Sequence, residues 1–398
     1  MIRVRFVAPS LGGLLVTGAR VALANMLFAR SRRGHFTLRL PEGEDRIAAD
    51  LRWLGIEWDT VGTPVDSAPA IEHLKAIGRL YPCFESEAEL RAKHDQRIRR
   101  GRSAVYDRGM LKLTAEQRAA AEAGGKRPYW RFRLSNRVVT WADEISGRHE
   151  AKLTAVSDPI LVAADGAPAA ALTAVVDDIE AGITHVIRAD EGDGMTGIHI
   201  DLLSALGQNP DAVTFAHLPP LGDTGRLAIR NLRNDGIEAE TLSNWFGGGA
   251  ERFNLRQMAG KPDPVALPSL NRDILARRDF AAVADRLPRG AAEPFWLAIR
   301  GQIDLLTEAR YWWDVVNGTI FPALPENAAA LIAAARAALP PEPWDTSTWP
   351  AWLAAIPADA GQAEALRLIL TGEERGPELA ALLPLIGRSR VLERLRGA

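Results

Sequence analysis

The stretch from Arg3 to Arg30 constrains the fold more than any other part of this chain. From Arg3 to Val7, charged and apolar side chains alternate with the period of two that is typical of a β-strand. Residues 9–13 contain a proline, a serine and two glycines, which indicate a turn. Apolar residues then recur at helical spacing from Gly18 onward. This order opens many α/β domains, and in nucleotide-binding ones the helix start binds an anion.

Strand and helix patterns alternate in two further blocks of the chain. In the second block, an apolar segment is followed by Asp177 and Asp178, which we expect to cap a helix-like turn. The other expected elements are strands at 35–40, 184–188 and 213–218, and helices at 46–54, 196–206, 328–339, 362–371 and 377–385. The predicted class is α/β, with a Rossmann-type parallel sheet split by an insertion and followed by mostly helical residues.

Length and composition limit the class of protein. A chain of 398 residues exceeds one typical hydrophobic core, so we expect two or three domains. Because the formal net charge is −2, any nucleic-acid partner must meet local basic patches. Cys83 is the single cysteine, which excludes an internal disulfide and a multi-cysteine zinc site. The sequence has neither a membrane-spanning apolar run nor a signal-peptide pattern, so we expect a cytoplasmic protein.

The expected insertion carries two groups of cations. One group lies in a predicted charged helix at 87–102, and the other surrounds Trp130 and Phe132. Interleaved cations and aromatic rings are suited to a nucleic-acid backbone. The alternative is a solvated surface neutralised by neighbouring acidic residues. The cations are Arg91, Lys93, Arg97, Arg99, Arg100 and Arg102 in the helix, and Lys126, Arg127, Arg131 and Arg133 near the aromatic residues.

Several motifs occur in a fixed order along nearly the whole chain. The most specific lie within 175–188, where Val-Val-Asp-Asp, Gly-Ile-Thr and Val-Ile-Arg follow one another. Others are Gly18-Ala19-Arg20, Trp53-Leu54-Gly55-Ile56, Cys83-Phe84, Ala216-His217-Leu218-Pro219 and Leu385-Ile386-Gly387. In this order the motifs resemble the glutamyl-tRNA synthetase family, a group of class I aminoacyl-tRNA synthetases.

The resemblance implies an enzyme that activates glutamate with ATP and transfers it to tRNA through an aminoacyl-adenylate. It implies ATP with Mg2+ and no zinc, tRNA and glutamate or an altered acid as partners, no membrane, and a monomer. It also implies five segments: Rossmann halves at 1–80 and 165–225, an inserted acceptor-stem-binding domain at 81–164, a helical stem-contact region at 226–301, and an α-helical anticodon-binding-like domain at 302–398.

The family motifs that handle the phosphates of ATP are altered in this chain. A histidine–glycine motif at the first helix start is replaced by Leu15-Val16-Thr17-Gly18. In the family's lysine-rich loop, Ala228 and Ile229 replace a serine and the inner lysine, while Arg226 and Arg230 keep the flanking positive charges. The resemblance therefore implies Thr17, Gly18, Arg226 and Arg230 as the catalytic residues. The alternative for the two arginines is a solvated surface, which is the commoner role of such a pair on a loop.

The amino-acid pocket implied by the resemblance is also altered. Its expected substrate-binding positions are Arg5, Ser10, Glu42, Ala170, Ala174 and Arg188. The two alanines stand where the family has a tyrosine and an asparagine, so contacts that discriminate between substrates are lost. Arg5 and Arg188 are retained, and each could bind a substrate carboxylate or form a buried ion pair.

These features leave three functions open. The chain could be a ligase of this family with weak or altered activity, because each lost phosphate-binding donor costs on the order of 3 kcal/mol of transition-state stabilisation. It could be a catalytically silent pseudoenzyme that binds tRNA or regulates a true synthetase. It could also be repurposed for a bulkier or less polar acid in the pocket widened by the two alanines.

Overall fold

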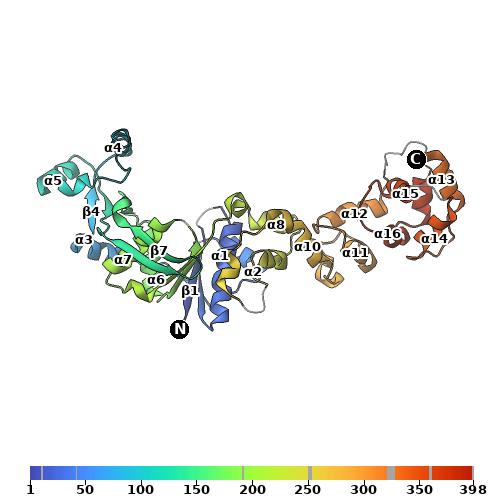
Figure 1. Cartoon of the computed structure of the whole chain (residues 1–398), viewed down its shortest axis with the longest axis horizontal. Helices are drawn as coiled ribbons and strands as arrows, with labels where there is room; N and C mark the ends of the chain where they lie inside the picture. The colour runs from blue at the N-terminus through green and yellow to red at the C-terminus, as the bar shows by residue number, and fades with distance from the viewer. Residues whose placement is uncertain are drawn as a thin grey trace. The chain divides into compact units, whose positions relative to one another are not determined.

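The chain forms two compact units (Figure 1). The computed structural model describes residues 1–9, 12–41, 43–190, 192–249, 253–320, 328–357 and 361–396. The first unit comprises Met1–Ala228 and Phe246–Pro262, and the second comprises Ile229–Trp245 and Asp263–Ala398. The chain therefore leaves the first unit after Ala228 and returns to it once. Among the helices that the structure describes, none has the length and apolarity needed to span a bilayer.

A three-stranded parallel sheet contains the N-terminal strand. Its order is β1-β2-β3, with β1 at Arg3–Val7, β2 at His35–Arg39 and β3 at Thr60–Gly62. Parallel neighbours require a crossover connection, and α1 (Val16–Ser31) and α2 (Asp45–Trp53) supply the two crossovers. The strand and the helix expected from the sequence are thereby confirmed, while residues 10 and 11 of the expected turn lie outside the described residues.

A second sheet has the order β7-β6-β10-β9. β10 pairs in parallel with both β6 and β9, whereas β6 and β7 form an antiparallel hairpin. This hairpin comes from the segment expected to be an insertion, so that segment contributes to the α/β sheet itself. The elements are β6 (Val138–Asp143), β7 (Gly147–Lys152), β9 (His185–Ala189) and β10 (Thr214–Leu218), with the helices α6 (Ala170–Glu180) and α7 (Asp193–Ala205).

The remainder of the insertion forms a small antiparallel sheet of order β4-β5-β8. Figure 1 shows α4 and α5 beyond β4 and away from β1. α4 begins with a capping box, in which Ser86 and Glu89 satisfy each other's backbone N–H groups, and it ends at Arg99. The elements are α3 (Ala68–Ala76), β4 (Leu80–Cys83), α4 (Glu87–Arg99), α5 (Ala115–Ala123), β5 (Tyr129–Phe132) and β8 (Ile160–Val162).

Asp177 and Asp178 do not cap a helix, which corrects the expectation from the sequence. α6 already begins at Ala170, and both aspartates lie in its last turns with buried side chains. Their carboxylates form ion pairs with Arg39, and Asp178 also pairs with Arg5. Two adjacent aspartates after an apolar segment match a cap pattern, but here they pair with buried arginines from β1 and β2.

A buried arginine ties α1 to two distant parts of the first unit. Arg20 donates from Nη1 to the carbonyl of Pro219 at 2.8 Å, just after β10. Its Nη2 donates to the carbonyls of Gly260, at 2.9 Å, and Met258. Burial lowers the pKa of Arg20 to about 10. The guanidinium therefore joins α1 to the end of β10 and to the segment 246–262.

The second unit is helical, as the sequence predicts. Its core contains the fully buried indoles of Trp296 and Trp352, surrounded by aliphatic side chains. α15 coincides with the helix expected at 362–371. The helices are α8 (Ile229–Asn234), α9 (Ala239–Trp245), α10 (Leu267–Leu275), α11 (Glu293–Ile299), α12 (Glu308–Asn317), α13 (Ala328–Ala337), α14 (Thr348–Ala355), α15 (Gln362–Thr371), α16 (Leu379–Ile386) and α17 (Arg388–Arg394).

Candidate active site

The N-terminus of α1 contacts the loop that follows β10. The Thr17 hydroxyl donates to the carbonyl of Gly225 at 3.1 Å, and the N–H of Val16 donates to the carbonyl of Leu227 at 2.9 Å. A glycine is needed for this approach, because a Cβ at Gly225 would lie 2.2 Å from Thr17 Oγ1. The structure thus brings together two segments that the sequence singles out, Thr17–Gly18 and the loop containing Arg226.

The N-terminus of α1 presents backbone N–H donors beside the loop that carries Arg226. The Val16 N–H and the Thr17 hydroxyl are already bonded to loop carbonyls. The N–H groups of Thr17 and Gly18 have no acceptor within the helix, because first-turn N–H groups lack one. Arg226 has a side chain that is 84% exposed and lies 3.9 Å from Asp223. These donors fit the polyphosphate of ATP in charge, with fewer side-chain donors than the family motifs supply.

Two further positions of the loop fall on α8. Ile229, which replaces the inner lysine, is fully buried at the start of α8. Arg230 is exposed on α8 and belongs to the second unit, whereas Arg226 belongs to the first. Ser10 and Glu42 lie outside the described residues. Among the described residues, no group of three His, Cys, Asp or Glu side chains could hold a metal ion.

Arg5 is bound by a buried carboxylate. Its Nε and Nη2 atoms donate to Oδ1 and Oδ2 of Asp178 at 3.0 and 3.1 Å. Nη1 of Arg39 lies 3.3 Å from an oxygen of the same carboxylate. Of the two roles left open by the sequence, Arg5 therefore adopts the ion pair in this structure. Ala170 and Ala174 lie on the same helix as Asp178, with Ala170 exposed and Ala174 half-buried.

Arg188 belongs to a hydrogen-bonded chain of four side chains. Its Nε donates to His217 Nε2 at 3.2 Å, and its Nη2 donates to Thr196 Oγ1 at 2.8 Å. Thr196 Oγ1 lies 2.9 Å from His217 Nε2, and His217 Nδ1 lies 2.6 Å from Asp143 Oδ2. Arg188 and His217 are register partners on β9 and β10, while Thr196 comes from α7 and Asp143 ends β6.

Asp143 is a buried carboxylate held by several donors. Its Oδ1 accepts the N–H groups of Ile145 and Ser146 at 2.9 and 3.0 Å and the Ser146 hydroxyl at 3.0 Å. Burial alone would raise the pKa of Asp143, but the hydrogen bonds from His217 and these backbone N–H groups outweigh burial and lower it. Asp143 is therefore charged at neutral pH. Nothing in the sequence pattern selects Asp143 or Thr196, because each becomes significant only through residues distant in sequence.

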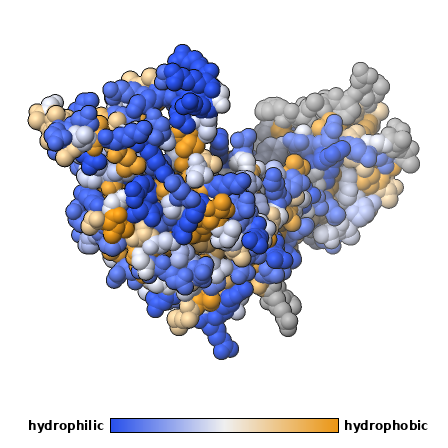
Figure 2. All heavy atoms as spheres, turned by 60° about the vertical axis from the view of Figure 1, so that its left-hand side comes forward, coloured by the Kyte–Doolittle hydropathy of each residue, from blue (hydrophilic) through white to orange (hydrophobic). Residues whose placement is uncertain are grey.

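The expected basic surface divides into bonded and exposed cations. The Arg131 guanidinium lies 4.3 Å from the ring centroid of Tyr106 and donates to the carbonyl of Asp158, so it has a structural role. Lys93 pairs with the buried Glu85. Figure 2 shows a strongly hydrophilic projection at the height that α4 has in Figure 1. Exposed cations with no hydrogen-bonded or ion-paired side chain among the described residues are Arg99, Arg100, Arg102, Lys126, Arg127 and Arg133.

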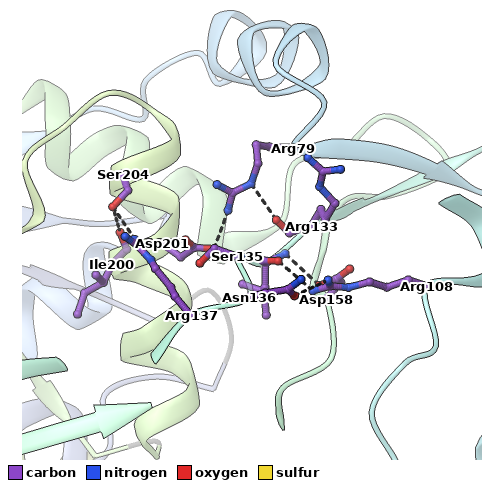
Figure 3. A network of polar contacts seen from close by, with 11 residues as sticks. Arg79, Arg108, Arg133, Ser135, Asn136, Arg137, Asp158, Ile200, Asp201 and Ser204 are labelled. Atoms are coloured by element: carbon purple, nitrogen blue, oxygen red, sulfur yellow. Dashed lines mark hydrogen bonds and ion pairs between the residues drawn. The ribbon is translucent and has the colours of Figure 1, made fainter. Parts of the chain in front are cut away.

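Two buried aspartates hold three further arginines beside this surface (Figure 3). Asp201, on α7, lies 2.6 Å from Nη2 of Arg79 and 3.3 Å from Nη2 of Arg137. Asp158 lies 2.8 Å from Nη2 of Arg108. Asp201 therefore joins the small antiparallel sheet to the α/β fold through Arg79, which precedes β4.

Comparison with known proteins decides the family. A family model described as "tRNA synthetases class I (E and Q), catalytic domain" matches residues 1–223. The chain belongs to this family. It is 47% identical to glutamate–tRNA ligase 2 of Acidiphilium cryptum (strain JF-5), with all of both chains covered, and 46% identical to glutamate–tRNA ligase 2 of Granulibacter bethesdensis, with 99% and 98% covered. The resemblance seen in the sequence is thereby confirmed.

A solved structure shares the fold of this chain. The crystal structure of a glutamate tRNA ligase from Elizabethkingia meningosepticum in complex with its amino acid matches with a TM-score of 0.75 at 20% identity, covering 99% of this chain and 98% of that one. The alignment to the Acidiphilium relative runs over 443 positions, although this chain has 398 residues. The relative therefore carries residues that this chain lacks.

Proposed function

We propose that this synthetase attaches glutamate to tRNA through an aminoacyl-adenylate, using ATP with Mg2+, at a reduced rate. The observation that carries the proposal is the contact between Thr17 and Gly225, because it holds the loop of Arg226 against the helix end where phosphates bind. The names of the full-length relatives support glutamate as the amino acid. The proposal includes a cytoplasmic monomer whose segments 81–164 and 302–398 contact the acceptor stem and the anticodon.

The retained groups act by position and charge. The N–H groups of Thr17 and Gly18, the positive end of α1 and Arg226 stabilise the phosphates during adenylate formation. Arg188 binds a carboxylate of the amino acid. Each side-chain donor lost from the family motifs removes on the order of 3 kcal/mol of transition-state stabilisation, so the expected rate is low.

A second candidate function is tRNA binding without catalysis. It is favoured by the hydrogen bond from the Val16 N–H to the carbonyl of Leu227, which uses a helix-end donor that a phosphate would otherwise meet. The exposed cations from Arg99 to Arg133 would then contact the RNA backbone.

Pyrophosphate exchange with a panel of all twenty amino acids tests the ligase proposal. We expect exchange above background with glutamate, a loss of about tenfold or more in Arg226→Ala, and wild-type exchange in Glu180→Gln, which alters an exposed residue of α6. Exchange with a different acid as the preferred substrate would favour the repurposed pocket. No exchange with any amino acid would overturn the ligase proposal.

Filter binding of total tRNA across a salt series tests the second candidate. A silent tRNA-binding protein predicts salt-dependent affinity without exchange, and the slope should fall by about one for each contacting cation replaced by alanine. Arg100→Ala and Arg133→Ala are suitable variants, with Glu122→Gln on α5 as the control. Affinity that does not depend on salt would rule out this role.

A further inference from the structure

We infer that Asp143 and His217 are positioning residues that set the orientation of Arg188 toward the carboxylate of the amino-acid substrate. The inference rests on the proposed function and names the groups that shape its amino-acid site. The chain Asp143–His217–Arg188 crosses three adjacent strands, and Thr196 of α7 joins its last two members. The guanidinium is therefore oriented by groups from β6, β10 and α7.

The contacts of Asp143 and Arg188 identify which nitrogen of His217 donates and which accepts. A charged carboxylate only accepts hydrogen bonds, so the proton between Asp143 and His217 lies on Nδ1 of the histidine. Nε2 then carries the single lone pair that accepts the Nε–H of Arg188, and the hydroxyl oxygen of Thr196 lies 2.9 Å from the same nitrogen. The Thr196 oxygen in turn accepts Nη2–H of Arg188.

Packing restricts the same histidine ring. The His217 ring lies nearly parallel to Phe215, with an interplanar angle of 7° and 6.3 Å between ring centroids. Thr196 is 0% exposed and Asp143 is 4% exposed, so neither side chain can reach a substrate in the site. Both therefore act through Arg188 and have no direct contact with the reacting groups.

The orientation of Arg188 matters because arginine recognises carboxylates through a planar fork of N–H groups. Acceptors at both Nε and Nη2 fix the plane of this fork. If Asp143 no longer selects the Nδ1–H tautomer, a proton on Nε2 of His217 faces the Nε–H of Arg188, and the two donors separate. A displacement of about 1 Å at a substrate-positioning group can cost about a hundredfold.

Three variants and a control test the inference. His217→Phe keeps the ring shape and removes both nitrogens, Asp143→Asn removes the charge that selects the tautomer, and His217→Gln restores an acceptor. Glu180→Gln is the control. We expect the Kd and KM for glutamate to rise about ten- to a hundredfold in the first two variants, with KM for ATP within about twofold of wild type. His217→Gln should recover part of the loss. Unchanged glutamate affinity, or an equal loss for ATP and glutamate, would overturn the inference.

Two readouts separate this inference from the proposed function. Glutamate binding measured by calorimetry needs no turnover. If the wild-type chain binds glutamate but exchanges no pyrophosphate, the ligase proposal fails. The glutamate affinity of His217→Phe relative to wild type then still tests the inference. A wild-type chain that binds no glutamate overturns the inference as well. In nuclear magnetic resonance, the Nε–H of Arg188 should exchange slowly with solvent in wild type and at least about tenfold faster in Asp143→Asn. Equal exchange rates in wild type and Asp143→Asn would contradict the role of the chain Asp143–His217–Arg188, even if the His217 variants fail to fold.

Discussion

Arg5 and Asp178 form a bidentate ion pair in which both side chains are almost fully buried. The pair joins the first strand of the synthetase fold to α6, and Arg39 of β2 shares the same carboxylate. Asp178 thus balances charges from two neighbouring strands, so its own charge is central to the stability of the first unit.

Asp178→Asn should destabilise the first unit by about 3–5 kcal/mol, because it leaves Arg5 and Arg39 buried with less compensating charge. Urea unfolding followed by circular dichroism measures the free energy of unfolding. Glu180→Gln, on the exposed side of the same helix, should stay within about 0.5 kcal/mol of wild type. Equal stability of the two variants would contradict the assigned role of the ion pair.

Gly225→Ala should destabilise the contact between the loop and α1. The added methyl would lie 2.2 Å from Thr17 Oγ1 and 3.1 Å from Leu221 Cβ, an overpacking that typically costs about 1–3 kcal/mol. Thr17→Ala removes the oxygen and leaves its Cβ 3.6 Å from the new methyl. The double variant should therefore recover at least about 0.5 kcal/mol in a double-mutant cycle. Gly260→Ala is the control, since a Cβ there meets nothing within 4 Å. Strict additivity would show that the two residues do not contact each other.

His199 should make stability depend on pH. It is 6% exposed, and burial lowers its pKa from 6.5 to about 3, with the charge of Asp178 acting in the opposite direction. Between these values the unfolded chain binds a proton that the folded chain does not, so stability falls as the pH falls, by at most about 1.4 kcal/mol per pH unit.

His199→Leu should remove this dependence, and its stability relative to wild type should rise from pH 6.5 toward pH 4. Urea unfolding at several pH values measures the difference. His94→Gln, at an exposed position on α4, should follow the wild-type curve. Parallel curves for His199→Leu and wild type would mean that the folded state accepts the proton without penalty.

Arg394 should stabilise the helical unit by bonding to the ends of two helices. It is buried and donates to the carbonyl of Leu370 in α15 and to those of Val315 and Gly318 at the end of α12. Arg394→Met leaves these carbonyls without the cation, at a cost of about 3 kcal/mol. Tryptophan fluorescence during urea unfolding measures the loss, with the exposed Arg396→Met as the control. A variant as stable as the control would show that other groups satisfy the carbonyls.

Local periodicity allowed much of the fold to be predicted. The strand at Arg3–Val7 and the helix at 362–371 lie where the pattern of apolar residues places them. Asp177 and Asp178 were assigned wrongly, because a cap and a pair of buried ligands for arginine have the same local sequence.

The candidate site was less accessible from sequence, because its contacts join distant residues. Thr17 contacts Gly225 across 208 positions, and no local pattern encodes such a contact. Arg188 was selected through the family resemblance, whereas Asp143 follows only from the pairing of β6 with β10. Each of these positions acquires its role from tertiary packing.

Arg20 limits how this protein can be cut into pieces. A fragment that stopped at Ala228 would keep the guanidinium and its Pro219 acceptor but would lose the carbonyls of Met258 and Gly260. Residues 1–228 therefore do not contain all the partners that the first unit needs. Truncation experiments on this chain must therefore retain residues 246–262, which belong to the first unit although they follow residues 229–245 of the second.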